Sequence, residues 1–174
     1  MRHTPVEALL ASVHDRERVF EFLCLFAGAE YALKRTNRLR RGHNDRAEAD
    51  WRKFADESLR GRLATNGTDA VTRAFELLRR DGGPKEQYVT EEGGLGWRPV
   101  PERQGEFDEW RLVRLVRTVR NNLFHGGKYG SLGPIGDPTR DVSLLAACVT
   151  ILKWCIEQDA TLAKQLGIWL HEAA

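Results

Sequence analysis

The side chains with the clearest chemical potential lie in residues 120–127, which read R-N-N-L-F-H-G-G. The imidazole of His125 titrates near neutral pH, so it can accept or donate a proton. The guanidinium of Arg120 can form paired hydrogen bonds to a phosphate and stabilise charge that develops on its oxygens. Asn121 can orient either group or the phosphate. These three groups suit metal-independent cleavage of an RNA phosphodiester by its own 2′-hydroxyl.

The spacing alone is not specific, because an Arg also lies five positions before a His at Arg38 and His43. That second pair lies in a charged stretch without an apolar period, and we interpret it as a coincidence. The pair of Arg120 and His125 instead follows a strongly periodic apolar segment. The sequence context, and not the spacing, therefore identifies Arg120 and His125 as the candidate site.

A helix over this segment would place the polar groups together. At 100° per residue, Arg117, Arg120 and Asn121 fall within an arc of about 100°, opposite most of the apolar side. Residues 126–127 are glycines, which can end a helix in the left-handed conformation. We expect His125 to stand at that terminus and to turn back toward Arg120.

The rest of the sequence predicts the helices that must hold this segment, within a single domain over residues 1–174. One helix begins after Ser12 or Asp15 and includes 19–33, and others cover about 47–63, 71–78, 106–125 and 137–156, with a short amphipathic segment at 162–169. The charged residues 34–45 fit a helix extension or a loop. The fold class we predict is all-α, an antiparallel bundle of four to five helices.

A long insertion, about residues 81–107, precedes the motif helix. It is rich in Gly, Pro and Glu and has no helical period. Residues 88–90 and 97–100 flank a Glu-Glu-Gly-Gly turn, so the insertion is either a long loop or a small hairpin. Trp97 lies in this insertion, where it could stack on a base.

Two segments concentrate positive charge in a chain of 174 residues whose formal net charge is only +2. Residues 34–62 hold ten Lys and Arg against five Asp and Glu, and residues 111–129 hold five Lys and Arg and no acidic residue. A fold that brings these segments together would have one positive face, as a nucleic-acid-binding protein needs.

Other classes of protein are excluded by composition and spacing. No apolar stretch approaches the roughly 20 residues of a membrane span, and the first residues lack the apolar core of a signal peptide. The three cysteines are expected to be reduced and mostly buried, which indicates a cytoplasmic protein. The five histidines lack metal-ligand spacing, and residues 126–128 do not form a phosphate-binding P-loop. We therefore expect no metal and no cofactor.

The pattern Arg120-Asn121-x-x-x-His125 resembles the signature of the HEPN superfamily, an Arg followed after four to six residues by a His. The resemblance implies an all-α bundle and, in active members, a metal-independent endoribonuclease. It also implies that two copies bring their motifs into one cleft. By motif position, Arg120 would bind the phosphate, His125 would act as acid and base, and Asn121 would support them. Such proteins act as toxins, in phage defence and in RNA processing.

We add Arg114, Arg117 and Lys128 as expected contacts to the RNA backbone. Some toxins of this family are silenced by nucleotidylation of a Tyr two residues after the His. Gly127 occupies that place here, and Tyr129 lies four residues after the His. That form of regulation is therefore not predicted.

A homodimer is expected because one imidazole cannot easily be both base and acid in a single step, whereas two copies across a two-fold axis can share the roles. A seam on the fifth helix is the expected contact between the copies, since its apolar residues recur at steps of 3, 4, 3 and 4. The seam residues are Val142, Leu145, Val149, Leu152 and Ile156.

Two alternatives remain open. The chain could be a non-catalytic binding or scaffold module that pairs with an antitoxin or a defence protein. It could instead sense a nucleotide, with Arg120 holding a phosphate.

Overall fold

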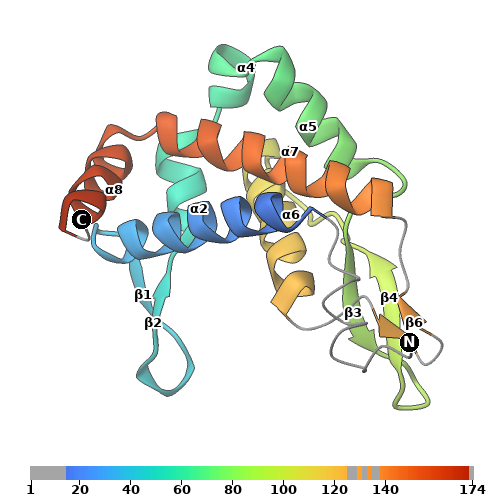
Figure 1. Ribbon diagram of the computed structural model, residues 1–174. Coiled ribbons are helices and arrows are strands. Elements are labelled where there is room, and N and C mark those ends of the chain that lie inside the picture. The colour runs from blue at the N-terminus through green and yellow to red at the C-terminus, as the bar shows by residue number, and fades with distance from the viewer. Residues whose placement is uncertain (1–14, 125–128, 131–132, 135–137, 173–174) are drawn as a thin grey trace, which may run out of the picture.

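One long helix, α7 (Pro138–Glu157), runs through the middle of the structure, and most other helices contact it (Figure 1). The structure is a computed structural model that describes residues 15–124, 129–130, 133–134 and 138–172. Helices α2 (Arg16–Lys34), α5 (Asp69–Arg79), α6 (Asp108–Phe124) and α8 (Ala160–Glu172) all pack against α7. The described chain is mostly helical, which confirms the predicted class.

The predicted direction of packing is wrong for two central helices. Figure 1 shows that α2 and α7 run in the same direction, whereas α5 runs in the opposite direction and α6 crosses them. Short loops force neighbouring helices to be antiparallel. Since many elements separate α2 from α7 in the chain, no short loop imposes that direction on this pair.

Helix α2 begins where the sequence predicts. Asp15 caps it, and the backbone N–H of Arg18 donates to the Asp15 carboxylate at 3.1 Å. Phe22, Phe26 and Leu33 recur along one side and are almost fully buried. Their burial in the common core holds the helix in place.

The helix predicted over residues 47–63 starts later and is interrupted. Asp50 caps α3 (Trp51–Phe54) by accepting from the backbone N–H of Lys53 at 2.9 Å. A π-helical turn (Ala55–Leu59) follows, and Gly61 then takes a positive φ of 77° before α4 (Arg62–Asn66). Such a φ suits glycine and ends a helix.

Residues 34–49 contain a hairpin that the sequence analysis did not predict. Strand β1 (Leu39–Arg41) pairs antiparallel with β2 (Ala47–Ala49), and a short 3-10 turn (His43–Asp45) joins them. All three residues of β1 are exposed. Because no apolar face alternates with a polar one, the period-two signal of a strand is missing.

The insertion before α6 forms the small hairpin that the sequence allowed. Strand β3 (Lys85–Val89) pairs with β4 (Leu95–Pro99), and Gly93 turns the chain with a φ of 79°. Trp97 lies half-buried in β4, opposite Gln87. Two very short strands, β5 (Tyr129–Gly130) and β6 (Gly133–Pro134), precede α7.

The seam on α7 is part of the core, which corrects its predicted role between two copies. Leu145, Val149 and Leu152 are 2–6% exposed, and Val142 and Ile156 are half-buried. Helices α2, α5 and α6 cover α7, so the narrow apolar stripe serves packing within one chain. Among the described residues, no helix combines the length and apolar character that crossing a membrane requires.

Candidate functional site

Arg120 lies on the C-terminal part of α6 and leans against α2. Its guanidinium carbon is 5.4 Å from the centre of the Phe26 ring, and its Nη2 is 4.0 Å from Oε2 of Glu30. Phe26 and Glu30 are four residues apart and therefore share one side of α2. Nη1 of Arg120 also donates to Oδ1 of Asn121 at 3.2 Å. The side chain remains 31% exposed, so the held guanidinium still reaches the surface.

Arg117 lies one turn before Arg120 in the middle of a mixed cluster of charges. Burial lowers the pKa of Arg117 below its ordinary value, and the positive charges of Arg40 and Arg120 lower it further. The carboxylates of Glu30 and Glu48 act in the opposite direction. Charges influence each other in this way only over short distances. The two basic segments of the sequence do contact each other, because the π-helical turn at Ala55–Leu59 packs against α6.

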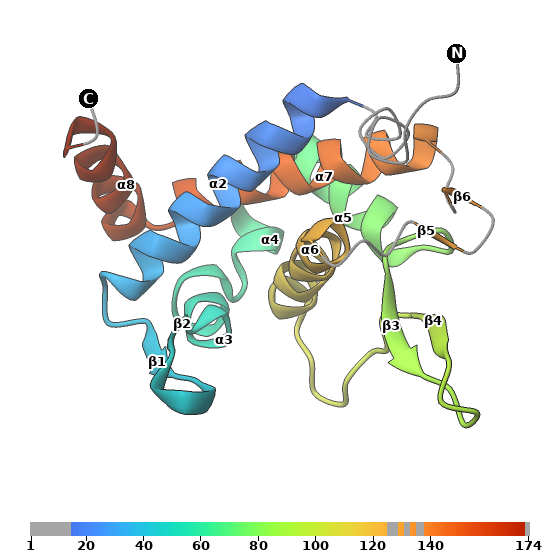
Figure 2. The ribbon, with the colours of Figure 1, turned by 60° about the horizontal axis from the view of Figure 1, so that its bottom comes forward.

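The two hairpins flank α6. In both views of the ribbon, α6 lies between the β1–β2 hairpin and the β3–β4 hairpin (Figures 1 and 2). On one side, Arg40 and Glu48 of the first hairpin act on Arg117. On the other side, Nδ2 of Asn122 donates to the carbonyl of Lys85 in β3 at 2.8 Å. This hydrogen bond ties α6 to the β3–β4 hairpin one residue after Asn121.

The predicted site residues do not all share one environment. Arg114 is 7% exposed, and its guanidinium donates to Glu106 at 2.5 Å and to the carbonyl of Pro101 at 3.3 Å. It fastens the segment before α6 to the helix, and this placement does not favour the expected contact with RNA. His125 and Lys128 lie outside the described residues. Arg117, Arg120 and Asn121 are the predicted residues that the structure brings together.

Arg38, of the other Arg–His pair Arg38 and His43, has a structural role. Arg38 is buried, and its Nη2 lies 2.7 Å from the carboxylate of Asp159 and donates to the Ser58 hydroxyl. His43 is exposed in the turn between β1 and β2. These positions agree with the interpretation of this pair as a coincidence of spacing.

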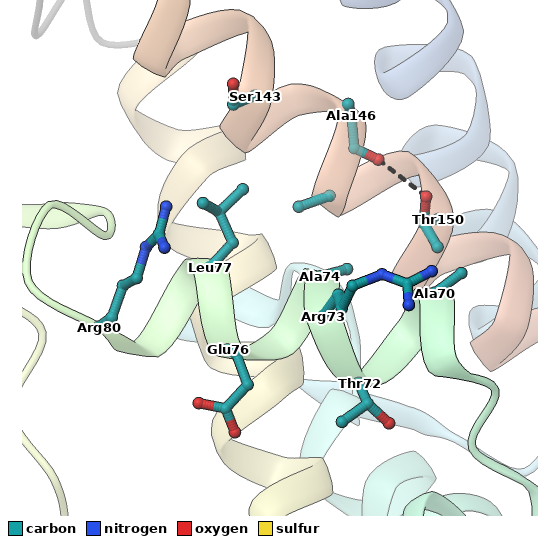
Figure 3. Close-up of a pocket in the computed structure, with 11 residues that line it drawn as sticks. Ala70, Thr72, Arg73, Ala74, Glu76, Leu77, Arg80, Ser143, Ala146 and Thr150 are labelled. Carbon is teal, nitrogen blue, oxygen red and sulfur yellow. Dashed lines mark hydrogen bonds between the residues drawn. The ribbon is translucent and has the colours of Figure 1, made fainter.

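A second concave surface lies away from the motif, between α5 and α7. It is an open groove of about 610 Å³, with Arg73 of α5 and Arg80, which directly follows α5, at its rim (Figure 3). Small residues form most of its floor. The floor residues are Ala70, Ala74, Ala146, Ala147 and Thr150. Figure 1 shows α5 and the β1–β2 hairpin on opposite sides of α7, so this groove and the hairpin belong to different faces.

Within the part of the chain that the structure describes, no three His, Cys, Asp or Glu side chains gather as they would around a metal ion. The buried thiols of Cys148 and Cys155 have pKa values raised by desolvation, whereas Cys24 is exposed. The expectation of mostly buried cysteines therefore holds for two of three. Comparisons with protein-family models, with curated proteins and with solved structures found no match for this chain.

Sequence reasoning missed the residues that hold Arg120 from outside its own helix. Phe26 lies in the helix predicted to include residues 19–33, but the sequence does not show that its ring also supports the guanidinium. Glu30 follows it by one turn, on the flank of the apolar side of α2. A carboxylate one turn after a buried aromatic was the available signal, but only the structure shows that Arg120 is the arginine that contacts both.

Proposed function

We propose that this chain is a metal-independent endoribonuclease of the HEPN type that cleaves RNA through attack of a 2′-hydroxyl. The observation that carries the proposal is the arrangement around Arg120. The partly exposed guanidinium of Arg120 is held by Phe26, Glu30 and Asn121. One turn earlier lies Arg117, whose pKa is lowered by burial and by the positive charge of Arg40. Such a site favours the arrival of an anion.

The proposed reaction assigns one task to each group. The 2′-oxygen attacks the neighbouring phosphorus while the bond from phosphorus to the 5′-oxygen breaks. His125 takes the 2′ proton, and an imidazole delivers a proton to the departing 5′-oxygen. Arg120 stabilises the charge that grows on the phosphate oxygens, and Asn121 orients the guanidinium. The products are a 2′,3′-cyclic phosphate and a 5′-hydroxyl.

The test is incubation of the purified chain with RNA in the presence of EDTA, followed by analysis of the cut ends. We expect cyclic phosphate and 5′-hydroxyl ends and no cleavage where the 2′-hydroxyl is replaced by hydrogen. His125→Ala should abolish cleavage, and His43→Ala is the matched control because it removes the other histidine that follows an arginine by five positions. Cleavage that requires a divalent cation, or that survives in His125→Ala, would overturn the proposal.

Arg120→Lys tests the role of the guanidinium separately. Lysine keeps the positive charge but lacks the planar fork that binds two phosphate oxygens. We expect the cleavage rate to fall on the order of 10²-fold or more, as when one stabilising donor is removed from a reacting centre. A rate close to that of the wild type would mean that only the charge matters.

The proposed setting is a toxin–antitoxin or phage-defence system, with a homodimer as the active form and an antitoxin or defence protein as a possible partner. The competing function is a binding module that holds RNA or a nucleotide without cutting it. The observation that favours it is that the guanidinium of Arg120 is already engaged by Glu30 and Asn121. Binding of RNA by the wild type without any cleavage would select this alternative.

A further inference from the structure

The hairpin formed by β1 and β2 carries three exposed arginines, Arg40, Arg41 and Arg46. The side chains of Arg40 and Arg41 are 53% and 77% exposed. Figure 1 shows that the hairpin extends away from the helices, below the end of α2. It is therefore a basic arm that solvent surrounds, unlike the buried arginines Arg38 and Arg114.

The arm is electrostatically continuous with the candidate site. The charge of Arg40 acts on Arg117, and Arg117 is also influenced by Arg120 one turn further along α6. The guanidinium groups of Arg40, Arg117 and Arg120 thus alternate with two carboxylates, since Glu48 lies 2.6 Å from Arg40 and Glu30 lies 4.0 Å from Arg120. The repulsion between like charges held close together decreases when an anion binds between them.

We propose that the β1–β2 hairpin is a second binding site for the substrate RNA, where its arginines hold backbone phosphates next to the phosphate at Arg120. This inference rests on the proposed function, because RNA is the ligand it assigns to the hairpin. Arginine suits this role, since its planar donors match phosphate oxygens and its charge does not depend on pH. Contacts of this kind position the strand and do not read its sequence.

The carboxylates on the hairpin do not prevent this role. Arg40 Nη2 lies 2.6 Å from Oε2 of Glu48, its cross-strand neighbour, and Arg41 pairs with Asp45 in the turn. Both pairs are well exposed, and exposed ion pairs contribute about 1 kcal/mol or less to stability. Phosphate oxygens can therefore replace the carboxylates at little cost.

The test measures RNA binding apart from cleavage, in a His125→Ala background, by fluorescence anisotropy with a labelled single-stranded RNA of mixed sequence. The hairpin variant combines Arg40→Gln, Arg41→Gln and Arg46→Gln. The control variant combines Arg73→Gln, Arg79→Gln and Arg80→Gln on and directly after α5, which removes the same charge from exposed positions on the other side of α7. Melting temperatures of both variants show that they remain folded.

We expect the hairpin variant to raise Kd on the order of tenfold and to reduce the salt dependence of log Kd by about 2, because each phosphate of a single strand that the protein neutralises contributes roughly 0.7 to that slope. The control variant should leave both nearly unchanged. A second variant, Asp45→Asn with Glu48→Gln, should tighten binding because it releases the hairpin arginines. Loss of folding could not produce this change of the opposite sign.

Three outcomes separate this inference from the proposed function. Equal effects of the hairpin and control variants, or no effect of either, would overturn the hairpin site even if the wild type cleaves RNA. Hairpin-dependent binding without cleavage by the wild type would support the hairpin site and overturn the nuclease. A larger effect of the control variant would place the RNA in the groove between α5 and α7 and overturn the hairpin site.

Discussion

At the scale of single residues, the support of Arg120 combines two contacts of different kinds. The ring of Phe26 is fully packed and fixes where the guanidinium can lie, and attraction between a cation and a ring contributes about 0.5–1 kcal/mol at such a site. Glu30 approaches only to 4.0 Å, so its carboxylate orients the guanidinium without forming a tight pair. This leaves the donors of Arg120 able to turn toward a phosphate.

Replacing Glu30 by Ala tests whether it positions Arg120. We expect kcat for RNA cleavage to fall roughly tenfold, because a misplaced catalytic group loses rate steeply with distance. KM should stay the same or fall, since one negative charge near the RNA is removed. A purely structural residue would lower both the melting temperature and the activity.

The control for this experiment is Glu76→Ala, which removes an exposed carboxylate that pairs with Arg79 at 2.9 Å on α5. The melting temperatures of both variants should stay close to that of the wild type, because exposed ion pairs contribute little. An unchanged kcat in Glu30→Ala would show that Phe26 and Asn121 suffice to hold Arg120.

At the scale of elements, a buried polar cluster ties together three segments that are distant in the chain. Arg38 precedes β1, Ser58 lies in the π-helical turn, and Asp159 caps α8 by accepting from the backbone N–H of Leu162 at 2.9 Å. Ser58 donates to Asp159 at 2.6 Å, and Arg38 lies 2.7 Å from the same carboxylate. These contacts fix the start of the β1–β2 hairpin to the N-terminus of α8.

Loss of one member of this cluster should lower the free energy of unfolding. Asp159→Ala leaves Arg38 buried without its closest carboxylate and removes the cap of α8. We expect the free energy of unfolding to fall by about 3 kcal/mol, as for other buried pairs that lose one partner. Urea unfolding followed by circular dichroism measures this, and Asp56→Ala, which removes an exposed pair with Arg60, should change it by less than about 1 kcal/mol.

The same carboxylate predicts a dependence of stability on pH. Burial alone would raise the pKa of Asp159, but the hydrogen bonds from Ser58 and the Leu162 backbone and the charge of Arg38 together hold it below the ordinary value of 3.8. A lowered pKa in the folded state adds stability that is complete above that value and is lost as the pH falls through the folded pKa. The difference in unfolding free energy between the wild type and Asp159→Asn should therefore shrink below about pH 4 and stay constant from pH 5 to 7.

The elements that the sequence predicted are those with an apolar stripe at helical spacing. Phe22, Phe26 and Leu33 in α2 illustrate this, because each faces the core and leaves a period of 3.6 in the sequence. The β1–β2 hairpin left no such signal, since cross-strand ion pairs such as Arg40 with Glu48 stabilise it instead of apolar contacts. In the site, Arg117, Arg120 and Asn121 followed from spacing on one helix. Glu30 and Arg40 did not, because tertiary packing brings them there.

At the scale of the whole molecule, a homodimer needs a surface other than the buried seam of α7. Helix α2 offers one, because Phe20, Cys24, Ala27 and Tyr31 recur at steps of four, three and four residues and are all exposed, Phe20 to 70%. Another side of the same helix holds Arg120 through Phe26 and Glu30. A contact between two copies along the exposed side of α2 would therefore leave Arg120 uncovered.

Phe20→Glu tests this surface by placing a charge at its most exposed aromatic residue. We expect sedimentation to show a dimer for the wild type at micromolar concentration and a monomer for Phe20→Glu. Val89→Glu is the matched control, since Val89 is 76% exposed on the β3–β4 hairpin. A monomeric wild type, or a dimer that only Val89→Glu disrupts, would contradict the use of α2.

The position of Cys24 on this surface provides an independent measurement. Cys148 and Cys155 are buried and their raised pKa values keep them as thiols, so a maleimide should react with Cys24 alone under native conditions. A short bismaleimide should then link two chains, and Cys24→Ser should abolish the linked product. Equal linkage in Cys24→Ser would place the contact elsewhere.

The central place of α7 has a consequence for biosynthesis. Every described helix that packs against α7, except α8, precedes it in the chain. During translation, core residues of the earlier helices, such as Phe22, Phe75 and Leu112, cannot be covered by α7 until residue 157 has left the ribosome. The nascent chain therefore passes through a long interval in which its apolar surfaces are exposed to chaperones and proteases. If the folded product cuts RNA, the activity cannot arise before α7 has been made and has packed against the earlier helices.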